Sequence, residues 1–139
     1  MSSEGTSDPV DCVAEQLDQI RANAQKVVDT LDPLTDFAFG YDGQSLEYLD
    51  GYLDRQRQRP EGPPDIATVV GCYVGEAIIA TYGGEWIREE KLGLGVKVQG
   101  ITASPFNKVT KMLDEGLEGG QSVSSFVRAV AAIIKQSDE

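Results

Sequence analysis

Apolar residues recur along this chain at three- and four-residue intervals, and the most continuous such stretch predicts a central helix over residues 66–82. Both faces of this segment are apolar or small, so we expect it to be buried on most sides. Gly71 and Gly75 lie one turn apart in it. Because each costs about 1 kcal/mol relative to Ala in a helix, we expect another backbone to approach closely there. Asp65 is the expected N-cap, and the glycine pair after Tyr82 should end the helix.

The same periodicity predicts four further helices, over residues 9–31, 44–57, 105–116 and 122–135. The first should open at Asp8-Pro9, and it carries a narrow apolar seam made of Val10, Val13, Leu17, Ile20, Ala24, Val27 and Leu31. This seam favours docking on the chain's own domain, and a coiled-coil dimer is the alternative. Between the first two helices, the alternation of Phe37 and Phe39 indicates an extended piece.

After the central helix the hydrophobic period changes to two, which predicts strands over residues 85–89, 96–99 and 101–104, with a turn at Gly93 and Gly95. The expected fold is therefore α+β, with four or five helices packed around the central apolar helix and a small antiparallel sheet of two or three strands. Residues 7–139 should form a single domain, and residues 1–6 a flexible tail.

Composition agrees with a folded globular chain, since 40% of the 139 residues are hydrophobic. The apolar run at the centre is short for a bilayer and is interrupted by Glu76, so no membrane-spanning segment is expected. The N-terminus lacks a basic region followed by an apolar stretch, which predicts no signal peptide and a cytoplasmic location. Cys12 and Cys72 then suit small buried thiols better than a disulfide, although a disulfide stays open.

The net charge of −11 is concentrated in residues 1–54, which hold twelve acidic and two basic residues. Such a balance disfavours binding to nucleic acid and to anionic membranes. It indicates a solvated acidic face, with a basic protein partner as the alternative. Glu47, Asp50 and Asp54 share one face of the second helix, where a divalent cation could bind. Carboxylates in this arrangement are more often solvated, and without a second cluster we predict no metal site.

The chain contains no histidine and no glycine-rich dinucleotide fingerprint, so we predict no cofactor and no histidine-based catalysis. Glu76 is unusual, because a carboxylate inside an apolar helix must be paired, hydrogen-bonded or protonated. It is the candidate catalytic residue, and the predicted ligand-binding set is Tyr73, Glu76, Trp86 and Lys108. Within this set an ion pair between Glu76 and Lys108 is the specific hypothesis, and a purely structural Glu76 is the competing one.

Four pieces of the chain carry a resemblance to a known group, in the order Tyr41-Asp-Gly-Gln-Ser-Leu-Glu-Tyr-Leu49, Gly71-Cys-Tyr-Val-Gly-Glu76, Tyr82-Gly-Gly-Glu-Trp86 and Pro105-Phe-Asn-Lys-Val109. Together they resemble a group of small uncharacterised bacterial domains, over about residues 37–130. The resemblance implies a compact α+β domain with no assigned activity, and it transfers no functional residue.

These observations favour a non-enzymatic protein-interaction or regulatory module, which would bind a protein partner or a second copy of itself. A small hydrolase or isomerase that uses Glu76 is the alternative. A third hypothesis is an acidic decoy for a nucleic-acid-binding protein, based on the charge of the N-terminal part.

Overall fold

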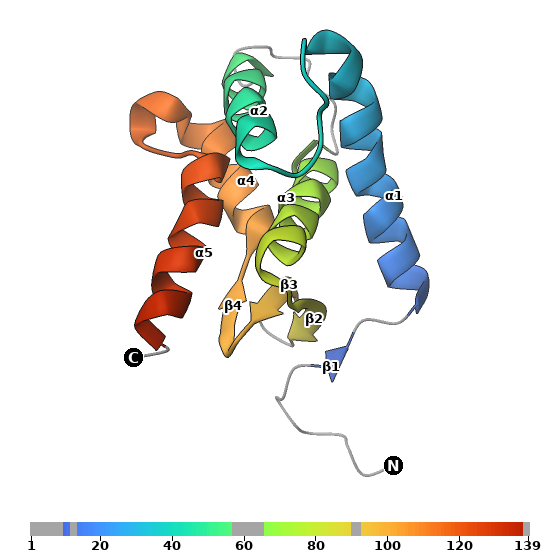
Figure 1. The fold of residues 1–139 in the computed structure, drawn as a ribbon, viewed down its shortest axis with the longest axis vertical. Helices are drawn as coiled ribbons and strands as arrows, with labels where there is room; N and C mark the ends of the chain where they lie inside the picture. Colours follow the sequence, from blue (N-terminus) through green and yellow to red (C-terminus); the bar gives the residue numbers. More distant parts are fainter. Residues whose placement is uncertain (1–9, 12–13, 57–65, 90–92, 138–139) are drawn as a thin grey trace.

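The centre of the fold is α3, the helix Ile66–Tyr82, which has the predicted bounds (Figure 1). The structure is a computed structural model that describes residues 10–11, 14–56, 66–89 and 93–137, so the predicted tail and the predicted cap at Asp65 lie outside the described residues. Eight consecutive or near-consecutive residues of α3 are buried, from Val70 to Ile78. The helix ends at Gly83, which has a φ of 81° and donates its N–H to the carbonyl of Ile79 over 2.8 Å.

The helix α1, Ala14–Leu31, packs along α3 with one apolar stripe made of Ile20, Ala24, Val27 and Leu31. The predicted docking of this seam on the chain's own domain is therefore confirmed. The predicted start of the helix at Pro9 is wrong, because Val10–Asp11 form the short strand β1. Val10 pairs with Arg88 and Asp11 with Ile87, so pairing with a distant strand replaces the local helical pattern at this end.

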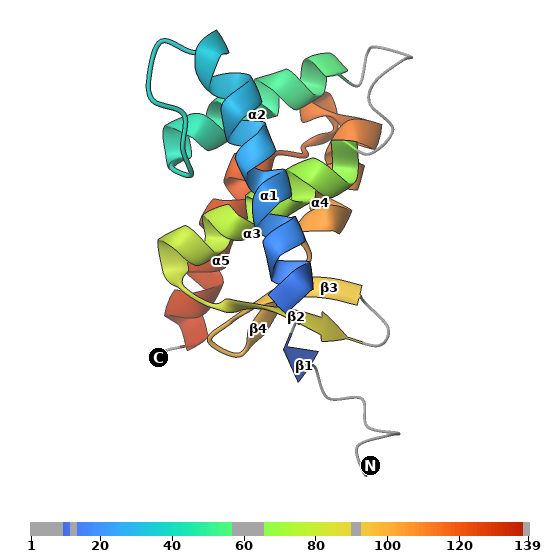
Figure 2. The ribbon, with the colours of Figure 1, turned by 90° about the vertical axis from the view of Figure 1, so that its right-hand side faces the viewer.

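The sheet is antiparallel and has the order β1-β2-β3-β4, in which β2 is Glu85–Glu89, β3 is Gly93–Val98 and β4 is Ile101–Ala103. The last three strands form the predicted meander. Figure 2 shows the strands at one end of the molecule, below α1 and α3. The predicted turn at Gly93 and Gly95 is wrong, since both glycines lie in β3. A Cβ at Gly95 would come within 3.0 Å of the Ala103 carbonyl oxygen, so the strands leave no room for a side chain.

Three more helices complete the α+β fold: α2 over Gly43–Gln56, α4 over Pro105–Glu115 and α5 over Val123–Ser137. Two short 3-10 helices, Asp32–Leu34 and Leu117–Gly119, follow α1 and α4. The predicted extended piece is wrong, because residues 35–42 form an irregular loop. Its Phe37 and Phe39 rings stack at 6.4 Å and both meet the Tyr48 ring edge-on, so they belong to the core rather than to a strand.

Two aromatic rings pack against Gly71 and Gly75 of α3. A Cβ built on Gly71 would lie 2.3 Å from the Phe106 ring, and one on Gly75 would lie 2.2 Å from the Trp86 ring. The close approach predicted at these glycines is thus made by side chains of α4 and β2 and not by a backbone. The two rings also contact each other, with centroids 5.9 Å apart.

The acidic face of α2 is a docking surface for the C-terminal part of the chain. Asp50 is only 7% exposed, and its carboxylate accepts the backbone N–H of Val123 over 2.6 Å and the hydroxyls of Ser122 and Ser124 over 2.9 and 2.5 Å. This carboxylate therefore caps the N-terminus of α5 from another helix.

The two neighbours of Asp50 on that face also bind C-terminal groups. Asp54 accepts the backbone N–H of Leu117 over 3.1 Å, and Glu47 lies 3.7 Å from the guanidinium of Arg128. The predicted solvated face is therefore wrong for Asp50, which is buried. Among the described residues no group of acidic or cysteine side chains could hold a metal ion, and no helix combines the length and apolar character of a membrane span.

Candidate functional site

Glu76 and Trp86 form one part of the predicted site. The indole N–H of Trp86 donates to Oε2 of Glu76 over 2.8 Å, and the indole itself is 3% exposed. The Glu76 side chain is half-buried, so this carboxylate is held in a contact that joins α3 to β2.

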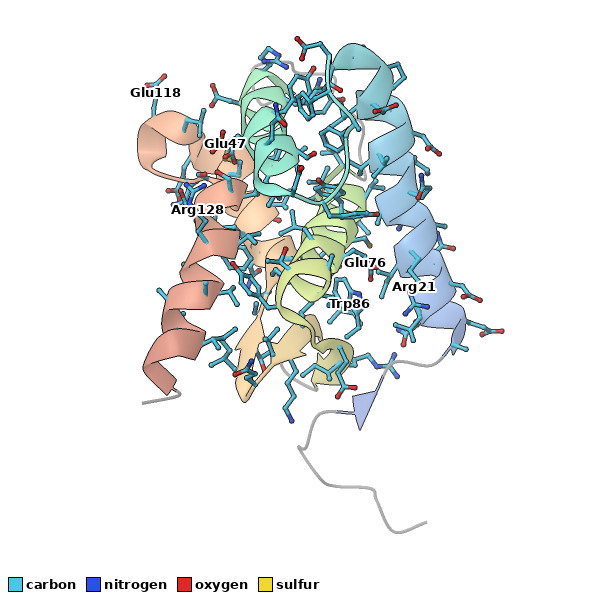
Figure 3. The ribbon with its side chains drawn as sticks, in the orientation of Figure 1. Arg21, Glu47, Glu76, Trp86, Glu118 and Arg128 are labelled. Atoms are coloured by element: carbon cyan, nitrogen blue, oxygen red, sulfur yellow. The ribbon has the colours of Figure 1, made fainter. Side chains whose placement is uncertain are left out.

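Glu76 also lines a small pocket of about 280 Å³ between α1, α3 and β2, whose other lining residues are Leu17, Arg21, Ile79, Gly84, Glu85 and Trp86. Figure 3 shows Arg21 extending from α1 toward the same region as Glu76 and Trp86. Arg21 and Glu76 do not form an ion pair. Among the described residues, the one ion pair found joins Arg128 to Glu47. The charge of Glu76 nevertheless reaches its neighbours. Burial first, and then this carboxylate, raise the pKa of the Tyr41 phenol.

Tyr73 belongs to a different environment, although it lies one turn before Glu76. Its hydroxyl donates to the carbonyl of Gly40, and its ring stacks on Tyr41 with centroids 5.0 Å apart and an interplanar angle of 21°. Burial, followed by the proximity of Tyr41 and Asp42, raises the pKa of the Tyr73 phenol well above its usual value of 10.0. Tyr73 therefore holds the loop before α2 against α3 and does not form a pair with Glu76.

Lys108 lies on the side of α4 that faces away from α3. The predicted ion pair between Glu76 and Lys108 is therefore wrong. The Lys108 ammonium donates to Oε1 of Gln121 over 2.6 Å, and Gln121 in turn donates to Glu115 over 3.0 Å. The physical reason is helix geometry. Phe106 packs on Gly71, and a residue two positions later is rotated by roughly 200° about the helix axis, away from α3.

The surface that receives Lys108 is a groove of about 690 Å³ between β4, α4 and α5, which we call the lysine groove. It is lined by Ile101, Thr102, Ala103, Ser104, Asn107, Lys108, Lys111, Gln121, Phe126, Ala129, Val130 and Ile133. About half of these side chains are apolar, two are lysines, and none is a carboxylate. Among the described residues neither lysine forms an ion pair.

Lys108 is a residue of the predicted ligand-binding set, but the groove around it was not predicted. The available signal was the pair Lys108 and Lys111, which lie three residues apart on a predicted helix and therefore on one face. The position of β4 and α5 beside that face depends on the tertiary arrangement, which periodicity does not specify.

The four predicted site residues thus separate into three places: Glu76 with Trp86, Tyr73 with Gly40, and Lys108 in the lysine groove. Compared with known proteins, the chain gives no match to a family model, to a curated protein or to a solved structure. A mechanism in which Glu76, Tyr73 and Lys108 act together does not fit this geometry. Chemistry at Glu76 by itself stays a prediction.

Proposed function

We propose that this chain is a non-enzymatic protein-interaction module that binds an acidic, partly apolar segment of another protein in the lysine groove. The observation that carries the proposal is the contrast of charge. The chain has a net charge of −11, yet the groove presents two lysines and no carboxylate. Complementary charge gives specificity and a faster association rate to protein recognition.

The ammonium of Lys108 supports this function because it is held in place before a partner arrives. Lys108 is half-buried, and its hydrogen bond to Gln121 fixes the ammonium at the wall of the groove. The amide of Gln121 accepts a hydrogen bond from the Lys108 ammonium, but because the amide is neutral it does not balance the positive charge. A carboxylate of the partner would therefore gain a charge-assisted hydrogen bond to a preorganised donor.

The apolar part of the groove supports a polypeptide partner rather than a small anion. Phe126 is half-buried and Ile133 is 45% exposed, and both line the groove beside β4. In the described sheet β4 is an edge strand that pairs with β3 alone, and all three of its residues line the groove. An extended segment could add to this edge through its backbone while alternate side chains meet the lysines and the apolar surface.

The test is a binding measurement with a short labelled peptide in which Glu and Val alternate, followed by fluorescence anisotropy at physiological salt. We expect saturable binding, and no binding of a peptide in which Lys and Val alternate. Lys111→Glu should weaken the affinity by on the order of tenfold, because it reverses a charge at the groove. Lys26→Glu is the matched control, since Lys26 is exposed on α1, does not line the groove, and the change in net charge is the same.

Equal affinity for the two peptides, or equal effects of the two substitutions, would contradict the proposal. Analytical ultracentrifugation of the chain alone shows whether a second copy of the chain occupies the groove. A dimer that Lys111→Glu dissociates and Lys26→Glu does not would assign the groove to a second copy of this acidic chain instead of to another protein.

A further inference from the structure

A separate pocket, of about 170 Å³, lies between α1, α2 and α3, and we call it the aliphatic pocket. Six aliphatic side chains form its walls, namely Val27, Leu31, Leu49, Ile66, Val69 and Val70. Four of the six are buried in the core, whereas Ile66 and Val69 are half-buried, so the pocket lies at the edge of the core. An apolar cavity of about 150 Å³ holds a molecule of the size of benzene.

The other three lining residues, Lys26, Thr30 and Tyr52, each carry a hydrogen-bond donor. Lys26 and Thr30 are exposed and Tyr52 is half-buried, so all three side chains are accessible from solvent. Among the residues that the structure describes, the Lys26 ammonium forms no ion pair and neither hydroxyl forms a hydrogen bond. An apolar pocket with a few accessible polar groups is the usual form of a small-molecule site.

The polar lining selects the charge of the ligand. The hydroxyls of Thr30 and Tyr52 can donate or accept, but the ammonium of Lys26 can only donate, and no carboxylate lines the pocket. An anionic oxygen of a ligand would therefore gain a charge-assisted hydrogen bond to Lys26. Because the lining has one cation and the whole chain has a net charge of −11, a singly charged group fits better than a doubly charged phosphate.

The aliphatic walls select the rest of the ligand. They offer no partner to a polar atom, and an unpaired polar atom is costly to remove from water. An apolar body instead gains about 25 cal/mol for each Å² that it removes from water. The volume limits this body to about one six-membered ring or a short alkyl chain.

We propose that the aliphatic pocket binds a small monocarboxylate, with the carboxylate at Lys26 and a compact apolar body between Leu31, Leu49 and Val70. The site is independent of the lysine groove, because the two share no lining residue.

The experiment is a titration of the full, isotopically labelled chain with benzoate, benzylamine and acetate, followed by two-dimensional NMR of the backbone amides. Benzylamine keeps the ring of benzoate but reverses its charge, and acetate keeps the carboxylate but lacks the ring. We expect saturable shifts with benzoate, largest at the residues that line the aliphatic pocket. The affinity for benzoate should exceed the affinities for benzylamine and acetate by at least about tenfold.

A pair of lysine variants tests the position of the carboxylate. Lys26→Gln should weaken benzoate binding by on the order of tenfold, and it should fold normally because Lys26 is exposed. Lys111→Gln is the matched control, since Lys111 is also exposed on a helix, carries the same charge and does not line this pocket.

Four results would overturn the proposal. They are the absence of saturable shifts with benzoate, equal affinity for benzylamine, equal affinity for acetate, and equal effects of the two substitutions. Acetate that binds as tightly as benzoate would identify a surface anion site at Lys26 in which the aliphatic walls take no part.

Discussion

The indole N–H of Trp86 and Oε2 of Glu76 lie 2.8 Å apart in a direct hydrogen bond. The bond joins the middle of α3 to the strand that begins three residues after this helix ends, so it fixes the reversal of the chain between helix and sheet. It also explains how an apolar helix tolerates a carboxylate. One oxygen is satisfied by the buried indole, and the half-buried side chain lines a pocket together with Arg21.

Removal of this bond should destabilise the fold in a way that a double-mutant cycle can measure. For Glu76→Leu, Trp86→Phe and the double variant, we expect a coupling energy of about 1 kcal/mol, because Leu removes the charged acceptor and Phe removes the donor. The measurement is urea-induced unfolding followed by circular dichroism. Glu85→Leu is the control, since Glu85 lines the same pocket but is exposed. Additive effects of the two substitutions would show that the bond contributes nothing to stability.

Gly75→Ala tests how tightly the Trp86 ring packs against α3. Alanine favours a helix by about 1 kcal/mol relative to glycine, but its methyl group would lie 2.2 Å from the Trp86 ring. We expect the clash to dominate, with a net loss of about 1–3 kcal/mol in the free energy of unfolding.

The matched control for Gly75 is Gly51→Ala on α2, where the nearest atom to the new Cβ is a side-chain nitrogen of Arg55 at 3.4 Å. There the helical preference should prevail, and the free energy of unfolding should rise by up to about 1 kcal/mol. Stabilisation by both substitutions would mean that the ring of Trp86 moves aside easily.

Asp50→Ala should be among the most damaging single substitutions in this chain. It removes the acceptor for the backbone N–H of Val123 and for the hydroxyls of Ser122 and Ser124, so buried donors at the start of α5 would be left unpaired. We expect a loss of about 2–4 kcal/mol, measured by thermal unfolding. Glu47→Ala, which breaks the exposed pair with Arg128, should cost less than about 1 kcal/mol. Similar losses of stability for Asp50→Ala and Glu47→Ala would contradict the role of Asp50 as the cap of α5.

Alkaline pH should weaken the fold through Tyr73. Burial raises the pKa of this phenol above its usual value of 10.0, so the folded chain holds the proton more tightly than the unfolded chain does. The stability that the neutral phenol contributes is therefore complete below about pH 10 and is lost as the pH rises further. Urea unfolding between about pH 9 and pH 11 should show this loss, and Tyr73→Phe should reduce the slope. Tyr52→Phe controls for the removal of a phenol, and identical slopes in the two variants would contradict the role of Tyr73.

The helices and the meander follow from local periodicity, which explains why the bounds of α3 and the span of β2 agree with the sequence analysis. An apolar face repeats every three to four residues whether or not its partner is known. The start of α1 could not be predicted in this way. Val10 and Asp11 are compatible with both states, and their pairing with β2 depends on a strand more than seventy residues later in the chain.

The candidate site was less accessible to sequence reasoning than the fold. Glu76 was identified correctly as a carboxylate that needs a partner, but its partner could not be selected among Trp86, Tyr73 and Lys108 from spacing alone. Asp50 was grouped with solvated acids because the groups that donate to its carboxylate, among them Ser122 and Ser124 at the start of α5, lie more than seventy residues away. Ser122 and Ser124 at the start of a predicted helix did indicate a capped terminus, but not the carboxylate that completes the cap.

Trp86 is the only tryptophan in the chain, and its buried position makes it an internal optical probe. Its indole contacts Phe106 and donates a hydrogen bond to Glu76, and none of these three residues lines the lysine groove. The emission of one indole can thus distinguish the pocket at Glu76 from the lysine groove without a label. A ligand beside Glu76 should change the emission, whereas a peptide beside β4 and α5 should leave it unaltered.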